Sequence, residues 1–221
     1  MTDTPNTTTF GHVALHYGKP EDGPLTAKLF KLMGFVTREE IAYPDGTVFY
    51  HFLVDPHATN KGDGILYLAP LKDVPRALYE AIRSTFRADQ PDEDKVVSDY
   101  RAAARENPEF GFHVGFLKSS LEELEEIVQR VQHAVETDPE FKGRVEVILN
   151  RAKPGTPEID ARMDASPVFR DVTRHTFGRN GVQAFVKTNL LAGPPLGDAV
   201  VIEFDYVFPE YETNMLTKSF D

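Results

Sequence analysis

The stretch Phe10-Gly-His-Val-Ala-Leu-His-Tyr17 decides the fold, because a similar stretch, Phe110-Gly-Phe-His-Val-Gly-Phe-Leu117, returns later in the chain. Their histidines, His12 and His113, stand 101 residues apart. Each stretch is typical of a β-strand and is followed by a helical pattern and then by further strands. A recurring order of elements indicates an internal repeat. The sequence therefore predicts two copies of one strand–helix–three-strand unit.

The first copy has well-marked boundaries. Pro24 suits a first helical turn, apolar residues follow at helical spacing, and Gly34 is placed to end the helix. Strands are predicted over 35–43, 47–54 and 64–70, with a turn at Pro44-Asp-Gly46 between the first two. We assign residues 10–71 to this first module, with residues 1–9 as a flexible N-terminal tail.

The second copy is longer. After the strand at 110–117, Ser119 opens a helix whose apolar face holds Leu121, Leu124, Val128 and Val131, and strands are predicted over 144–149, 182–187 and 198–208. The second module is thus residues 110–208, with an insertion at about 151–180 that is predicted to be a loop or lid. Two connecting helices are expected within residues 72–109, and residues 209–221 form a C-terminal tail.

Composition excludes several classes of protein. The 221 residues include no cysteine, so disulfides and thiolate metal ligands are excluded. The net charge of −11 without a local basic patch argues against nucleic acid as a partner, and against a membrane surface. No apolar run approaches the length of a membrane span, and no signal-peptide pattern opens the chain. We expect a cytoplasmic protein with a small-molecule substrate.

A metal site is predicted where the repeats meet. If the two modules pair edge to edge, their first strands lie side by side and His12 and His113 face a shared interior. Glu203 stands in the middle of an apolar strand, where an unpaired charge is costly. Two histidines and one carboxylate suit a divalent ion. Asp205 is the alternative acid, and each residue also has an ordinary interpretation: a packed histidine, or a Glu203 paired with a buried base.

The opening His12-Val-Ala-Leu, the following Leu32-Met-Gly-Phe35 and the late Glu203 together resemble the vicinal oxygen chelate superfamily. This superfamily contains glyoxalase I, bleomycin resistance proteins and extradiol ring-cleavage dioxygenases. The resemblance implies an α+β fold of two paired βαβββ modules, which form a partly open mixed barrel-like sheet with a metal cleft, plus connecting helices. It also implies that His12, His113 and Glu203 are the metal ligands.

The type of chemistry is predicted from a missing ligand. Glyoxalase-like members add an acid in the first module, but counting from Gly62 places Leu68 opposite Glu203, with Tyr67 the alternative after a shift of one residue. Three ligands resemble the Fe(II) site of extradiol dioxygenases, which open catecholic rings; Mn, Zn or Ni are the other candidate ions. The Tyr and Thr-Pro-x-Gly-like turn of that branch are absent. A glyoxalase-type lyase or isomerase, and a metal-free binding protein, are the competing interpretations.

Three further residues are candidates for catalysis. His51 and His175 are possible general bases, because imidazole titrates near neutrality. Tyr206 is a possible hydrogen-bond donor to a bound oxyanion. The protein is also expected to form a homodimer.

Overall fold

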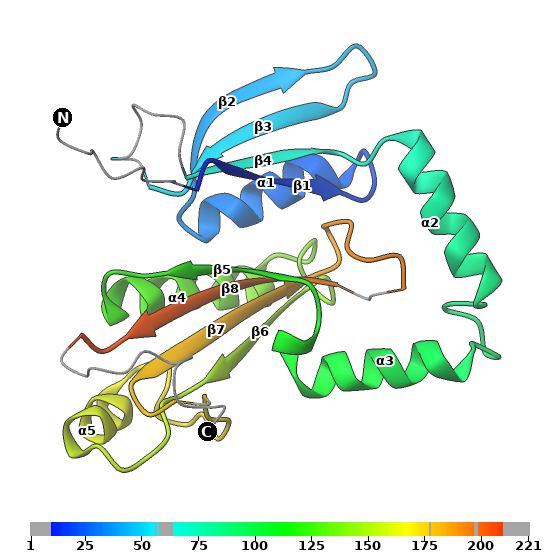
Figure 1. Cartoon of the computed structure of the whole chain (residues 1–221). Coiled ribbons are helices and arrows are strands. Elements are labelled where there is room, and N and C mark those ends of the chain that lie inside the picture. Colours follow the sequence, from blue (N-terminus) through cyan, green and yellow to red (C-terminus); the bar gives the residue numbers. More distant parts are fainter. Residues whose placement is uncertain (1–9, 56, 58–63, 177, 197–198, 210–221) are drawn as a thin grey trace, which may run out of the picture.

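The computed structural model describes residues 10–55, 57, 64–176, 178–196 and 199–209. The tails predicted at 1–9 and 209–221 lie outside this part of the chain, apart from Pro209, and so do the glycines Gly62 and Gly197. Two βαβββ modules follow one another along the chain (Figure 1). The first contains β1 (His12–Tyr17), α1 (Asp22–Leu32), β2 (Val36–Ala42), β3 (Val48–Leu53) and β4 (Ile65–Pro70). The second contains β5 (His113–Leu117), α4 (Leu121–Thr137), β6 (Val145–Asn150), β7 (Gly181–Thr188) and β8 (Val200–Val207).

Each module forms its own four-stranded mixed sheet. The strand order is β1-β4-β3-β2 in the first sheet and β5-β8-β7-β6 in the second. In both sheets the first strand pairs in parallel with the fourth, and the other neighbours are antiparallel. The predicted α+β class with two βαβββ modules is confirmed, and the sheets are not closed into a barrel.

Local sequence signals fix the ends of the two module helices. Gly34, with a φ of 92°, ends α1 in the left-handed conformation that favours glycine. At the start of α4, the Ser120 hydroxyl accepts a hydrogen bond from the Glu123 backbone N–H at 3.2 Å. Acidic residues in the first turn of α4 add a favourable interaction with the helix dipole.

The core of the molecule lies between the two sheets. α1 covers one face of the first sheet, α4 covers one face of the second, and the two helices contact each other (Figure 1). Phe35 joins the modules, because its ring lies 5.0 Å from that of Phe116 and 5.9 Å from that of Phe204, between ring centroids. Both helices lie between the two sheets. The face of each sheet that points away from the other module is therefore not covered by α1 or α4.

The predicted edge-to-edge pairing of the first strands is wrong. In the described residues β1 pairs with β4 alone, and its outer edge meets the segment after β7 through a bridge between Tyr17 and Leu191. β5 pairs with β8 in the other sheet. The physical reason is that α1 and α4 contact each other between the sheets, so that the two modules share one apolar core, which includes Leu29, Phe30 and Leu124.

Strand register nevertheless confirms the repeat. His12 pairs with Ile65 in the first sheet, and His113 pairs with Val201 in the second. Tyr67 is therefore the structural equivalent of Glu203. The prediction of Leu68 was wrong by one residue, because Leu68 alternates with Tyr67 along β4 and its side chain is buried in the core on the helix-covered face.

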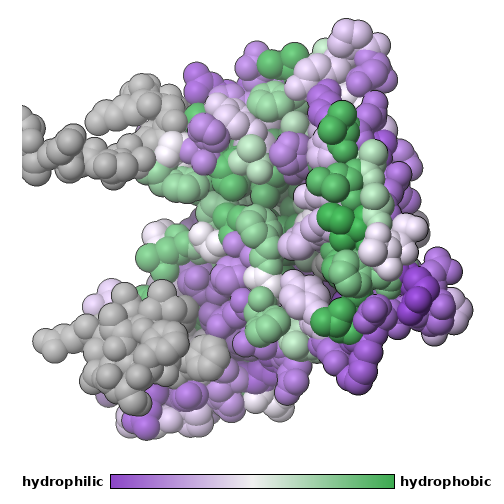
Figure 2. Space-filling view, turned by 45° about the vertical axis from the view of Figure 1, so that its right-hand side comes forward, coloured by the Kyte–Doolittle hydropathy of each residue, from purple (hydrophilic) through white to green (hydrophobic). Residues whose placement is uncertain are grey.

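The connection between the modules consists of α2 (Asp73–Thr85), α3 (Lys95–Glu106) and a short 3₁₀ helix (Pro108–Phe110). α2 buries none of its residues, and Val74 and Leu78 on its apolar face are 83% and 58% exposed. Figure 2 shows green side chains gathered on this side of the surface. No helix in the described residues is long and apolar enough to cross a membrane.

The insertion at 151–180 contains a helix that the sequence pattern did not predict, α5 (Pro157–Ala165). Arg162 of α5 binds the Glu125 carboxylate of α4 with two hydrogen bonds, at 3.0 and 2.8 Å. Ser166 also donates to Glu125. This part of the insertion is therefore docked on α4.

Phe35→Ala should destabilise the protein by about 3–5 kcal/mol, because it opens a cavity where the two modules meet. Val74→Ala is the matched control, and with its side chain exposed it should change the free energy of unfolding by less than about 0.5 kcal/mol. Urea unfolding followed by circular dichroism measures both. Equal effects of the two substitutions would contradict the shared core.

Candidate functional site

Two of the predicted metal ligands meet on the helix-free face of the second sheet. His113 of β5 and Glu203 of β8 lie on the same face, and His113 Nε2 is 3.5 Å from Glu203 Oε2. The other ring nitrogen, Nδ1, lies 3.1 Å from the Gly111 carbonyl oxygen, which orients the imidazole so that Nε2 faces the carboxylate. Glu203 is 5% exposed. A buried acid with a histidine beside it is therefore a feature of the fold.

Asp205 stands two residues after Glu203 and points to the same face. Burial, followed by the negative charge of Glu203, raises the pKa of Asp205 to about 8. Burial also raises the pKa of Glu203, against the opposing effects of a hydrogen bond from Asp205 and the nearby His113. A single proton, held on Asp205 and shared with Glu203 through a hydrogen bond, accounts for the raised pKa of both carboxyl groups. Asp205 Oδ1 is buried and has no hydrogen-bond partner.

The side-chain amides of Gln183 and Asn150 form a chain of hydrogen bonds that ends at Glu203. Gln183 Nε2 donates to Glu203 Oε1 and to Glu109 Oε1, both at 2.7 Å. Asn150 Nδ2 donates to Gln183 Oε1 at 3.0 Å, and Arg174 Nε donates to Asn150 Oδ1 at 3.1 Å. Sequence reasoning missed these four supporting residues. The available signal was Gln183, a polar residue within the otherwise apolar run 182–186.

Gly115 leaves space beside the two acids. It pairs with Glu203 across the β5–β8 ladder, and a Cβ atom placed on it would stand 3.8 Å from Asp205 Oδ2 and 3.9 Å from Glu203 Oε2. A side chain at this position would therefore reach into the space in front of both carboxyl groups. Glycine keeps that space open.

The equivalent face of the first sheet carries aromatic rings in place of acids. The His12 ring lies 5.0 Å from that of Tyr67, and the His51 ring lies 5.3 Å from the same tyrosine. Phe49 lies 5.3 Å from Tyr67 on the third side. Burial lowers the pKa of His51, whose Nε2 is buried without a hydrogen-bond partner. His12 and His51 therefore belong to one cluster, which is separate from His113 and Glu203.

The other two catalytic candidates lie away from the acids. Tyr206 alternates with Asp205 along β8 and so points to the opposite face, where its ring lies 5.1 Å from Phe208. His175 is exposed and its backbone forms an isolated bridge with Arg151. The structure thus brings together His113, Glu203 and Asp205, and does not bring His12, His51, His175 or Tyr206 to them.

The described residues of one chain do not by themselves form a complete site for a divalent metal ion. The donors of His113 and Glu203 are of the right type, and the orphaned Asp205 oxygen and the space at Gly115 favour a ligand there. In the described part of the chain, however, no three His, Asp or Glu side chains are grouped so that they could hold an ion. Within that part, His113 and Glu203 are two adjacent potential donors without a third beside them.

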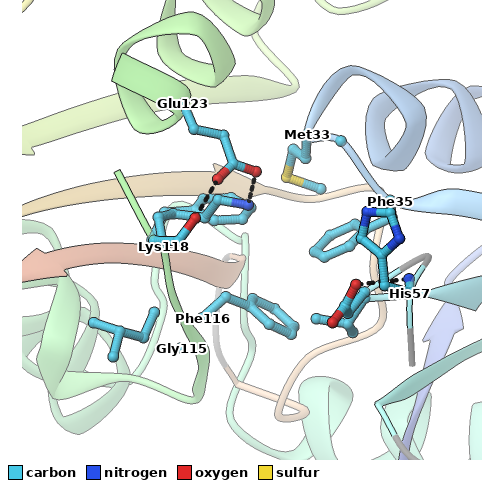
Figure 3. Close-up of a pocket in the computed structure, with 13 residues that line it drawn as sticks. Met33, Phe35, His57, Gly115, Phe116, Lys118 and Glu123 are labelled. Atoms are coloured by element: carbon cyan, nitrogen blue, oxygen red, sulfur yellow. Dashed lines mark hydrogen bonds and ion pairs between the residues drawn. The ribbon is translucent and has the colours of Figure 1, made fainter. Parts of the chain in front are cut away.

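A cavity of about 610 Å³ lies between the modules, beside the edge strand β5 (Figure 3). Its floor is apolar, formed by Met33, Phe35, Phe116 and Phe204. Lys118 and Glu123 form an ion pair of 2.5 Å at its rim. The volume is in the range of small-molecule sites. Gly115 lines this cavity as well as the space beside the acids.

Comparisons with known proteins give limited information. No family model matches the sequence, and no curated protein matches it either. Among solved structures, UcmS2 has 9% sequence identity and a TM-score of 0.40, over 90% of this chain and 98% of that one. A hypothetical protein from S. aureus has 10% identity and a TM-score of 0.34, over 92% and 93% of the two chains.

A glyoxalase superfamily protein from Ralstonia eutropha also resembles this chain weakly, with 12% identity and a TM-score of 0.21 over 91% of this chain and 73% of that one. Similarities at this level assign no function. The class of protein is therefore defined by the molecule itself: two βαβββ modules, with a histidine and buried acids on one open sheet face.

Asp205 predicts a pH dependence of stability in protein freed of metal with EDTA. Its pKa rises from 3.8 to about 8 on folding, so the folded state binds more protons between these values, and raising the pH lowers stability. The effect is at most about tenfold in the folding equilibrium constant per pH unit. Asp205→Asn should remove the part of this loss that comes from Asp205, while the smaller part due to the raised pKa of Glu203 should remain. Urea unfolding from pH 4 to 9 measures it, and a constant difference between the two proteins would contradict the assignment.

Proposed function

We propose that the protein is a divalent-metal-dependent enzyme of the vicinal oxygen chelate type, acting on a small molecule, whose site is formed between two chains. His113 and Glu203 of one chain would supply two ligands, and His12 of a second chain would supply the third. The observation that carries this proposal is the oriented contact between His113 Nε2 and Glu203 Oε2 on the sheet face that α4 does not cover. The expected homodimer becomes a requirement of the site.

The placement of His12 supports the exchange between chains. It is exposed on the open face of the first sheet, at the position equivalent to His113. The helices α1 and α4 and the core around them separate the two open faces within one chain. A second copy that places its first sheet against the second sheet of its partner brings the two histidines together, without any change within either chain.

Residues around the pair have defined tasks in this proposal. Gln183 holds Glu203 Oε1, so the other carboxylate oxygen remains directed at His113. Asp205 holds a proton beside the substrate position that Gly115 keeps open. Fe(II) is the proposed ion, with Mn, Zn or Ni as other candidates; when bound it would lower the pKa of two adjacent substrate oxygens and hold them for reaction. The proposed reaction is oxygenation of a catecholic ring.

Two other functions compete with this one. A lyase or isomerase of glyoxalase type would use the same residues without oxygen, and oxygen-uptake measurements separate it from a dioxygenase. A metal-free binding protein is favoured by the cavity with its floor of phenylalanine rings. Such a protein would purify without metal and bind apolar molecules equally well after substitution of His113.

Freshly purified protein should contain about one divalent ion per chain, measured by elemental analysis. His113→Ala and Glu203→Gln should each weaken metal binding by more than about a hundredfold, since even residues that only support a metal ligand cost 10–100-fold. His133→Ala is the matched control, because this histidine is exposed on α4, away from the open face. Equal metal content in all four proteins would contradict the proposed ligands.

Mixing two inactive variants tests the exchange between chains. His12→Ala and Glu203→Ala each lack a ligand in every site of their own homodimer. In a mixed dimer, one site would carry both substitutions and the other would carry neither. A mixed dimer should therefore bind as much as about half of the metal that the wild-type dimer binds. Mixing His113→Ala with Glu203→Ala is the control and should recover nothing, because both residues come from one chain. Recovery in neither mixture, or in both, would overturn the arrangement.

A further inference from the structure

A second cavity, of about 800 Å³, lies where the end of β1, helix α2 and the segment 189–195 after β7 come together. We propose that this cavity binds a small molecule carrying an oxyanion group, a phosphate or a carboxylate. The proposal is independent of the metal site. Its basis is the cluster of basic side chains that line the cavity: Lys19, Arg76, Arg83 and Arg144.

Two of these cations are already neutralised by lining acids. Arg144 Nη1 lies 2.7 Å from Asp22 Oδ1, and Arg83 forms an ion pair with Asp89. Lys19 and Arg76 form no ion pair in the described part of the chain. Glu80 is the remaining acid of the lining. The cavity therefore has an excess of positive charge within a protein whose net charge is −11, and this excess favours an anion.

Arg76 has an unused donor. Its Nη2 donates to the Leu71 carbonyl oxygen at 2.8 Å, whereas its Nε is buried without a hydrogen-bond partner. A buried N–H without an acceptor is unfavourable, and a small rotation of the Arg76 side chain toward an acceptor in the cavity would remove this cost. The planar guanidinium matches the paired oxygens of a carboxylate or phosphate better than any other side chain. Arg76 is thus the principal contact of the proposed ligand.

The location gives the ligand a structural effect. α2 buries no side chain, and its described hydrogen bonds to the rest of the molecule include Arg76 to Leu71 and Arg83 Nη1 to the Pro195 carbonyl oxygen at 3.0 Å. An anion between Arg76 and Lys19 would add a contact between α2 and the first module. Binding should therefore slow amide hydrogen exchange in α2, over residues 73–85.

The test uses three probes, inorganic phosphate, pyrophosphate and succinate, titrated into the full chain in a calorimeter, with potassium chloride at matched ionic strength as the reference. We expect saturable one-to-one binding of at least one probe, with protection of α2 against hydrogen exchange. Phosphate-only or succinate-only binding identifies the oxyanion, and both results support the site. Arg76→Gln should weaken binding at least about tenfold, the loss expected for a hydrogen bond to a charged group.

Two further variants make the result decisive. Lys19→Gln, at an exposed position that should not affect folding, should also weaken binding, and it serves if Arg76→Gln proves unstable. Lys142→Gln, an exposed lysine beyond α4, should leave binding unchanged. Absence of binding by all three probes would overturn the proposal. So would an equal loss in Lys142→Gln, because it would show that only the overall charge attracts the anion.

Discussion

Packing of α1 against α4 is the constraint on which the rest of the structure depends. The apolar side of each helix covers its own sheet, and the contact between the two helices joins the two halves into one core. Phe35 completes this contact by touching Phe116 and Phe204 of the other module. The open faces of the two sheets, and with them the two repeat histidines, are consequently held apart within one chain.

The repeat preserves positions while the chemistry at those positions differs. His12 and His113 are equivalent, and each contacts the residue at one equivalent position of the fourth strand, Tyr67 in the first sheet and Glu203 in the second. One face is therefore an aromatic surface, and the other is an acidic site. This difference explains why the second module alone offers a buried carboxyl pair, whose proton is retained because burial and the neighbouring charge both oppose ionisation of Asp205.

Much of the fold could be predicted from sequence, because the necessary signals are local. Helical spacing, Gly34 and the Ser120 cap mark helices, and alternation marks strands. Glu203 could be singled out as an acid within an apolar strand, and the structure places it beside His113. The packing of the modules did not, since an apolar helix face is the same whether it is covered by a sheet or by another helix. In the network of Gln183, Asn150 and Arg174, only Gln183 stands out in the sequence, as a polar residue in an apolar run; its partners depend on contacts between distant segments.

The helices between the two sheets separate His12 from His113 within one chain. Because the chain has no cysteine, the double variant His12→Cys, His113→Cys carries spin labels at these two positions and at no other. Dilution with unlabelled protein then restricts pulsed electron paramagnetic resonance to the distance within one chain. We expect a resolved distance between the two nitroxides rather than direct contact, because the helices and the core lie between the two sheet faces. A short distance within one chain, with the two labels in contact, would contradict both the helix packing and the exchange of ligands between chains.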